Sequence, residues 1–246
     1  MKRYGGLVGA AVLLAVWGLL ATTVFSLGDG IPTPWAVLSQ LGHDGWSFYK
    51  PHVAQTGKEA ALGFLFGNGI AFGLALVVLL VPPIERVVLQ LAVASYCLPV
   101  VAVAPILSIV FTGDRPMAAL AALAVFFTSL VGVLLGLRSA DPASLDLVTV
   151  YGGGRWQQLR RVRLVAAAPA ALAALKVAAP SAVLGALLGE YLGRVDHGLA
   201  VAMTISEQQL DVARTWGVAF VAALLAGGAY GLLALLQRVL TPWEQS

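Results

Sequence analysis

The chain has 246 residues, of which 59% are hydrophobic and only 11% are charged, and its net charge is +3. A water-soluble domain carries about 25% charged residues, so this composition excludes an ordinary soluble protein. The basic residues lie at the ends of apolar runs, which argues against nucleic-acid binding. The single cysteine, Cys97, excludes an intramolecular disulfide and a cysteine-based metal cluster.

Several apolar runs are long enough to cross about 30 Å of hydrocarbon as helices. They lie at about residues 5–25, 60–81, 87–111, 117–137, 169–190 and 215–236. Because the runs are continuous rather than alternating, the pattern predicts an all-α polytopic membrane protein with about six transmembrane helices in a single domain, residues 1–246. We expect the first run to be a retained span, since it ends in a poor signal-peptide cleavage sequence.

The stretches between the runs are expected to be mostly loops. Residues 27–57 hold several glycines and prolines and predict only a short interfacial helix at 35–41, and residues 193–213 are polar enough for a loop. The lone histidines of the first stretch, His43 and His52, are predicted to be solvated rather than ligands, and His197 lies in the second stretch.

The spans contain a few residues that suit a translocation pathway. Pro99 and Pro105 break one span, and such breaks are tolerated where a cavity or neighbouring helices satisfy the backbone; a simple kink is the alternative. Lys176 lies inside the fifth span and is expected to reach back to the interface, while Glu190 closes that span. These four residues are the candidate pathway residues. The pairs Gly63/Gly67 and Gly69/Gly73 have the spacing that permits close helix packing.

The loop at about residues 139–165 contains the sequence DPASLDLVTVYGGGRWQQLRRVRLV. Asp141 is suited to cap a helix and Pro142 to begin it, with Leu145, Val148 and Tyr151 recurring every three residues. Gly152 to Gly154 then end the helix, and a second helix is predicted from Arg155. This helix, glycine hinge and helix would form a docking surface for a soluble partner.

The distribution of positive charge predicts the topology. If the N-terminus is placed on the cytoplasmic side, most of the 15 Lys and Arg residues also lie on that side. Cytoplasmic loops of membrane proteins usually carry such an excess of Lys and Arg. Both termini and the 139–165 loop are therefore predicted to be cytoplasmic. The residues placed inside are Lys2, Arg3, Arg86, Arg138, Arg155, Arg160, Arg161, Arg163 and Arg238, and those outside include Lys58 and Arg115.

This loop and its flanking spans resemble the permease subunit of a bacterial ABC importer of the sulfonate, taurine and nitrate type. The family's EAA loop has the sequence Glu-Ala-Ala, three residues and Gly; here Asp146, Leu147 and Val148 take the first three places and Gly152 takes the glycine. The resemblance covers about residues 54–243. The sequence departs from the family pattern in its shorter acid and in the bulkier Leu147 and Val148.

The resemblance implies that two permease subunits, as a homodimer or heterodimer, form a pathway in the bacterial inner membrane above two ABC ATPase subunits. The EAA loop would supply a coupling helix that docks on an ATPase, with ATP and Mg bound by that partner and no cofactor or metal on this chain. A separate extracellular or periplasmic binding protein would deliver a small solute, for which an anion such as a sulfonate or nitrate is the candidate. The implied coupling residues are Asp146, Leu147, Val148, Tyr151, Gly152, Gly153 and Arg155.

Two other classes of function remain as alternatives. A secondary transporter driven by an ion gradient would need acidic residues within its spans, and the predicted spans hold almost none. An intramembrane enzyme would need a nucleophile with a histidine partner or an H-E-x-x-H motif, and all three histidines lie in predicted outer loops. The chain also lacks a G-x-x-x-x-G-K-[ST] phosphate loop, so it is not expected to be an enzyme.

Overall fold

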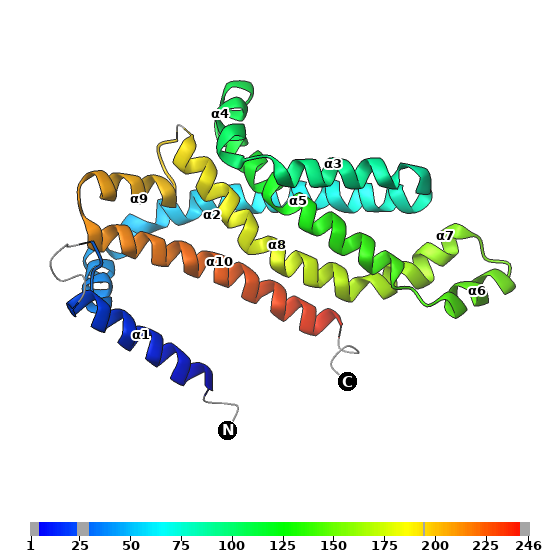
Figure 1. Cartoon of the computed structure of the whole chain (residues 1–246), viewed down its shortest axis with the longest axis horizontal. Helices are drawn as coiled ribbons and strands as arrows, with labels where there is room; N and C mark the ends of the chain where they lie inside the picture. The colour runs from blue at the N-terminus through cyan, green and yellow to red at the C-terminus, as the bar shows by residue number, and fades with distance from the viewer. Residues whose placement is uncertain (1–4, 24–29, 194, 242–246) are drawn as a thin grey trace. The chain divides into compact units, whose positions relative to one another are not determined.

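The computed structural model describes residues 5–23, 30–193 and 195–241, and every regular element within them is helical (Figure 1). The predicted all-α class is therefore confirmed. The elements are α1 (Gly5–Thr23), α2 (Pro34–Leu80), the 3₁₀ turn η1 (Pro82–Ile84), α3 (Glu85–Cys97), α4 (Val100–Val110), α5 (Arg115–Arg138), α6 (Pro142–Val150), α7 (Arg155–Gln158), the π-helical turn η2 (Leu159–Arg163), α8 (Leu164–Leu192), α9 (Leu199–Gln208) and α10 (Val212–Leu240).

Four helical stretches are long and apolar enough to cross a membrane, and a bent pair makes up to five. The four are Pro34–Leu80, Arg115–Arg138, Arg155–Leu192 and Val212–Leu240. The bent pair, Pro82–Cys97 with Val100–Val110, turns by 97° at its break. About six spans were predicted. The described residues hold four or five, because the third run is broken and Ala11–Thr23 is a shorter apolar helix.

The break in the third run lies at Pro99, as the sequence suggested. Leu98 and Pro99 are extended, and Pro99 precedes the first turn of α4. A proline cannot donate a backbone hydrogen bond and disfavours helix at the residue before it, so α3 ends there. Pro105 lies within α4. The prediction of a kink is confirmed, and the bend is close to a right angle.

Contacts divide the chain into two compact units, each described by itself below. The first comprises Met1–Gln55 and Asp196–Ala223, and the second comprises Thr56–Val195 and Leu224–Ser246. The single domain expected over residues 1–246 stays a prediction.

In the first unit, much of the chain expected to be loop is helical. Helix α2 begins at Pro34 and is interrupted only at Gly45, whose φ of 67° is left-handed, and α9 occupies the predicted 193–213 loop. The polar residues that suggested a loop bond to one another instead. The buried carboxylate of Asp44 binds the Arg214 guanidinium at 2.7 Å and accepts a hydrogen bond from the Tyr49 hydroxyl at 3.1 Å. Paired in this way, charged and polar side chains are compatible with a packed helical unit.

His52 is also packed rather than solvated, so that prediction was wrong. Its Nδ1 accepts a hydrogen bond from the backbone N–H of Gly198 at 3.1 Å, and its ring lies 5.8 Å from that of His197. The loop prediction failed here because the residues that satisfy His52 are more than 140 positions away in the sequence.

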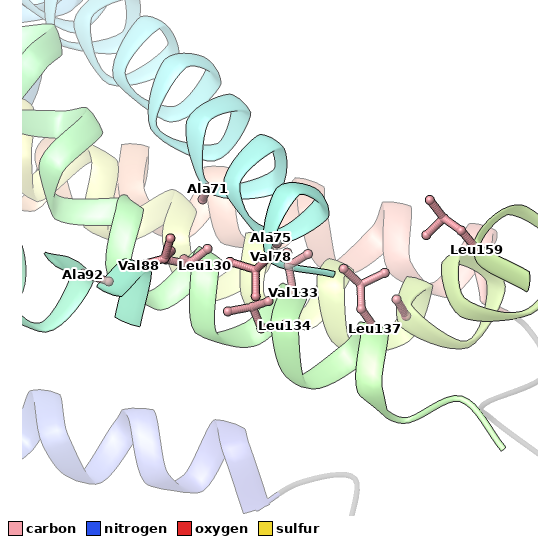
Figure 2. Packing of buried hydrophobic residues seen from close by; sticks show 11 residues of the cluster. Ala71, Ala75, Val78, Val88, Ala92, Leu130, Val133, Leu134, Leu137 and Leu159 are labelled. Carbon is pink, nitrogen blue, oxygen red and sulfur yellow. The ribbon is translucent and has the colours of Figure 1, made fainter. Parts of the chain in front are cut away.

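The core of the second unit is built around α5, which packs side by side with α8 (Figure 1). Figure 2 shows one apolar cluster of this unit, in which side chains of α2, α3 and α5 meet. Its labelled members are Ala71, Ala75, Val78, Val88, Ala92, Leu130, Val133, Leu134, Leu137 and Leu159. A second cluster joins α2, α5 and α8 through Ala60, Ala121, Val125, Ala178, Ala182, Val183 and Ala186.

The two glycine pairs of α2 differ in what they face. A methyl group at Gly63 would lie 2.7 Å from the carbonyl oxygen of Ala118 in α5, and one at Gly67 would lie 2.5 Å from that of Ala122. Gly69 and Gly73 have nothing within 4 Å of such a methyl group among the described residues. Of the two pairs on α2, only Gly63 and Gly67 lie in close contact with α5.

We expect Gly63→Ala to destabilise the protein by about 1–3 kcal/mol, because the added methyl group forces the backbones of α2 and α5 apart. Gly69→Ala is the matched control on the same helix and is expected to be neutral or slightly stabilising, since alanine favours helix over glycine. Thermal unfolding of the purified chain in detergent measures both. Equal melting temperatures for the two variants would contradict the assignment of close packing to Gly63.

Candidate coupling and pathway sites

The loop after α5 begins with a capped helix, as predicted. The Oδ2 atom of Asp141 accepts hydrogen bonds from the backbone N–H of Ser144 at 3.1 Å and from its hydroxyl at 3.0 Å, and Pro142 begins α6. The bond from the Ser144 hydroxyl, followed by that from its backbone N–H, holds the pKa of this carboxyl below its usual value. Both bonds favour the charged carboxylate, which also suits the positive end of a helix.

The glycines after α6 make a tight turn that requires their lack of a side chain. Gly152 has φ of 77°, in the left-handed region, and the backbone N–H of Gly153 donates to the carbonyl oxygen of Val148 at 2.8 Å. A methyl group at Gly153 would lie 2.5 Å from Cγ1 of Val148. Gly154 is extended and open, and α7 begins at Arg155 as predicted.

Helix α6 is braced against the helix that follows the turn. The side-chain amide of Gln158 donates to the carbonyl oxygen of Leu145 at 3.2 Å and to the hydroxyl of Thr149 at 2.9 Å. The brace connects two helices across the glycine turn, so α6 is held in a defined position. Gln158 was not singled out from the sequence, where nothing marks it among the neighbouring polar residues.

The predicted stripe of Leu145, Val148 and Tyr151 does not lie on one exposed side. Leu145 and Val148 are half-buried, whereas Tyr151 is 84% exposed. We define the docking face by the large exposed apolar side chains of this loop. They are Leu147 (58% exposed), Val150 (82%), Tyr151 (84%) and Trp156 (68%). Asp146 is exposed on the same helix.

Val150 and Trp156 belong to this face but were not among the predicted coupling residues. The spacing from Leu147 to Val150 is a signal that the sequence did contain, because residues three apart lie on neighbouring turns of a helix. Trp156 lies beyond the glycine turn, where helical spacing no longer relates it to α6. Arg155 is exposed at the start of α7.

The loop is joined to a membrane span without a break. From Arg155 the chain remains helical through η2 and α8 to Leu192, a stretch of 38 residues. The guanidinium of Arg163 donates to the carbonyl oxygen of Leu137 at 3.3 Å, which fixes the start of this stretch to the end of α5. The loop and the span are therefore parts of one continuous helical stretch.

The candidate pathway residues are not brought together at one place. Pro99 and Pro105 lie at and after the bend between α3 and α4, while Lys176 and Glu190 lie on α8. The ammonium of Lys176 donates to Oε1 of Gln237 at 2.7 Å and lies 5.7 Å from the Tyr230 ring centroid. These contacts with α10 provide the partners that a cation needs away from water.

Glu190 is part of a buried polar cluster. It is 2% exposed and accepts a hydrogen bond from the Thr56 hydroxyl at 2.5 Å. Thr56 and Glu59 are both fully buried, and they lie one turn apart on α2. Glu59 immediately precedes the apolar run at 60–81 and was not singled out from the sequence, because its burial depends on the packing of α2 rather than on its neighbours in the chain.

Known proteins resemble this chain over most of its length. Residues 63–245 match the protein family described as binding-protein-dependent transport system inner membrane component. A "Probable ABC transporter permease protein" of Haemophilus influenzae is 32% identical over 204 residues, which cover 82% of each chain. The formylaminopyrimidine transport permease protein ThiX of Halalkalibacterium halodurans is 26% identical over 237 residues, or 95% of this chain and 93% of that one.

A third relative matches a shorter part of the chain. The riboflavin transport system permease protein RibX of Chloroflexus aurantiacus is 31% identical over 165 residues, which are 66% of this chain and 61% of the relative.

We expect Gly152→Val to loosen the turn by about 2 kcal/mol, because a β-branched residue is strained at positive φ. Amide hydrogen exchange at residues 142–158 should then become roughly thirtyfold faster, the ratio that corresponds to this free energy. Gly154→Val is the matched control, since Gly154 is extended and has open space around it. If both variants exchange at the rate of the unaltered chain, the left-handed turn does not hold α6 in place.

Proposed function

This chain belongs to the family of binding-protein-dependent transport system inner membrane components, and we propose that it is the permease subunit of an ATP-driven importer of a small solute. It is a multi-pass membrane protein and an ABC transporter permease. In the proposed complex, two such subunits or this chain and a paralogue form the pathway, and separate ATPase subunits bind and hydrolyse ATP with Mg. A binding protein outside delivers the solute.

The observation that carries this proposal is the docking face together with its brace. Large apolar side chains exposed at a water-filled surface cost free energy unless a partner covers them, and a patch of this kind marks an interaction site. Tyr151 and Trp156 are residues of the type that dominates binding energy at protein interfaces. Asp146 is placed to pair with a basic group of the ATPase.

The mechanical step follows from the continuous helix. Closure of the ATPase subunits around ATP would displace α6, and the Gln158 brace would pass this displacement to α7. Because α7, η2 and α8 form one helical stretch, the spans would reorient with it. The proposed cytoplasmic position of the loop and of both termini follows from the excess of Lys and Arg on that side.

The solute is proposed to be small and anionic. The chain carries a net charge of +3, and the segments predicted to lie outside include Lys58 and Arg115. The names of two relatives specify a formylaminopyrimidine and riboflavin as the compounds that those proteins transport, so solute type varies among the relatives. Selection would rest largely with the binding protein, which contacts the solute first.

A second candidate function is secondary transport driven by an ion gradient. The buried carboxyl groups of Glu59 and Glu190 favour it, because acidic side chains inside a membrane protein commonly carry protons or cations. Against it, this function gives the docking face no role.

The first test removes the docking face. We expect Tyr151→Ala and Asp146→Lys each to reduce recovery of the partner ATPase in a pull-down at least about fivefold, because each removes a central interface contact worth roughly 1 kcal/mol or more. Tyr191→Ala and Asp196→Lys change the same residue types at exposed positions outside the face and should leave recovery unchanged. Undiminished recovery with all four variants would exclude the docking role.

The second test separates the two functions. The purified chain in liposomes, with an imposed proton or sodium gradient and no ATPase subunit, should take up no solute, because the permease has no source of free energy of its own. Uptake should appear when the ATPase, the binding protein and ATP are added. Uptake driven by the gradient alone would establish the secondary transporter instead.

A further inference from the structure

The second unit contains a cavity of about 940 Å³ that none of the roles above uses. Its walls come from α2, the end of α3, the turn between α4 and α5, and the first half of α5. Small-molecule sites in proteins have volumes of roughly 300–1,000 Å³, so the cavity is of the size of such a site. The described residues that line the cavity include none of the four candidate pathway residues, Pro99, Pro105, Lys176 and Glu190.

Most of the lining is apolar, and its largest members are aromatic. Phe66 of α2, Phe111 after α4 and Phe126 of α5 approach the cavity from three different elements. Aromatic side chains favour stacked or edge-to-face contact with another ring and gain roughly 0.5–1.5 kcal/mol per pair beyond the burial of their surface. Three rings around one cavity therefore favour a planar aromatic ligand over a flexible aliphatic chain.

The charged groups lie together at one part of the lining. Lys58 Nζ and Asp114 Oδ2 are 2.8 Å apart, so their charges offset each other. Arg115 also lines the cavity and has no ion-pair partner among the residues that the structure describes. The charged lining residues are thus two cations and one anion, and a guanidinium binds planar carboxylate, sulfonate or phosphate groups through paired hydrogen bonds.

We propose that this cavity binds a planar aromatic anion, with its ring system against Phe66, Phe111 and Phe126 and its anionic group at Arg115. The placement of this cavity on the transport path rests on the proposed function of the chain as a permease. Lys58 and Arg115 belong to segments predicted to lie outside, so the charged end would open toward the side from which a binding protein delivers its solute.

The probe for the test is radiolabelled naphthalene-2-sulfonate, with the full chain in nanodiscs of zwitterionic lipid. We expect saturable binding that hexane-1-sulfonate and 2-naphthylmethylammonium displace poorly, because the first lacks the ring and the second has the wrong charge. Arg115→Gln should weaken binding at least about tenfold, the usual effect of losing a charge-assisted hydrogen bond, and Arg115→Lys should weaken it less.

Matched variants show whether the effect is specific to the cavity. Phe111→Ala and Phe126→Ala should each weaken binding roughly three- to tenfold, the ratio that corresponds to one aromatic contact. Arg86→Gln and Phe220→Ala change the same residue types outside the cavity and should leave the affinity unchanged. An equal affinity for hexane-1-sulfonate would indicate a lipid site and overturn the proposal, as would an unchanged affinity of Arg115→Gln.

A labelling experiment covers the case in which an alanine variant does not fold. In a Cys97→Ser background, Thr112→Cys places a thiol at the exposed part of the lining. Naphthalene-2-sulfonate should slow its reaction with a maleimide at least fivefold, and an unslowed reaction would overturn the proposal. The binding assay contains no ATPase, so it is independent of the pull-down. Loss of naphthalene-2-sulfonate binding with normal ATPase recovery in the pull-down would exclude only this binding site. Loss of ATPase recovery with normal binding would exclude only the coupling role.

Discussion

Close approach of helix backbones at small residues is the constraint on which the second unit depends. In a bilayer, apolar side chains gain little by leaving lipid for protein, so helices associate where small residues let their backbones meet. Gly63 and Gly67 provide this contact between α2 and α5, and Gly185 and Gly189 provide it between α8 and α5. A methyl group at Gly185 would lie 2.7 Å from Cα of Ala121. Helix α5 is thus held between two neighbours that cannot move away without losing their packing.

This packing connects the two candidate sites. Helix α5 begins with Arg115 at the cavity and ends at Arg138, immediately before the loop that carries the docking face. Helix α8 begins beside that loop and carries the buried Glu190 in its last turn. A displacement of the docking face would therefore act on a pair of packed helices rather than on one, which suits a transporter that alternates between two rigid arrangements.

The sequence predicted correctly those structural features that depend only on residues close together in the chain. The cap at Asp141, the glycine turn, the restart at Arg155 and the break at Pro99 all depend on neighbouring residues, and each was predicted. The helical segment before residue 60, the burial of Glu59 and the cavity depend on partners far away in the sequence. Asp44 and Arg214, 170 positions apart, form one ion pair in the fold but read as two separate loop residues.

The π-helical turn at Leu159–Arg163 has a consequence for the alignment of the coupling loop with its span. Such a turn accommodates one residue more than an α-helical turn does. Because the extra residue is taken up within one turn, deleting it would restore regular α-helix and leave the direction of everything before it nearly unchanged, whereas deleting a residue from regular α-helix would rotate the preceding part by about 100°. The π-helical turn therefore accommodates an additional residue between the loop and its span while Trp156 and the docking face keep their direction around the axis of α8.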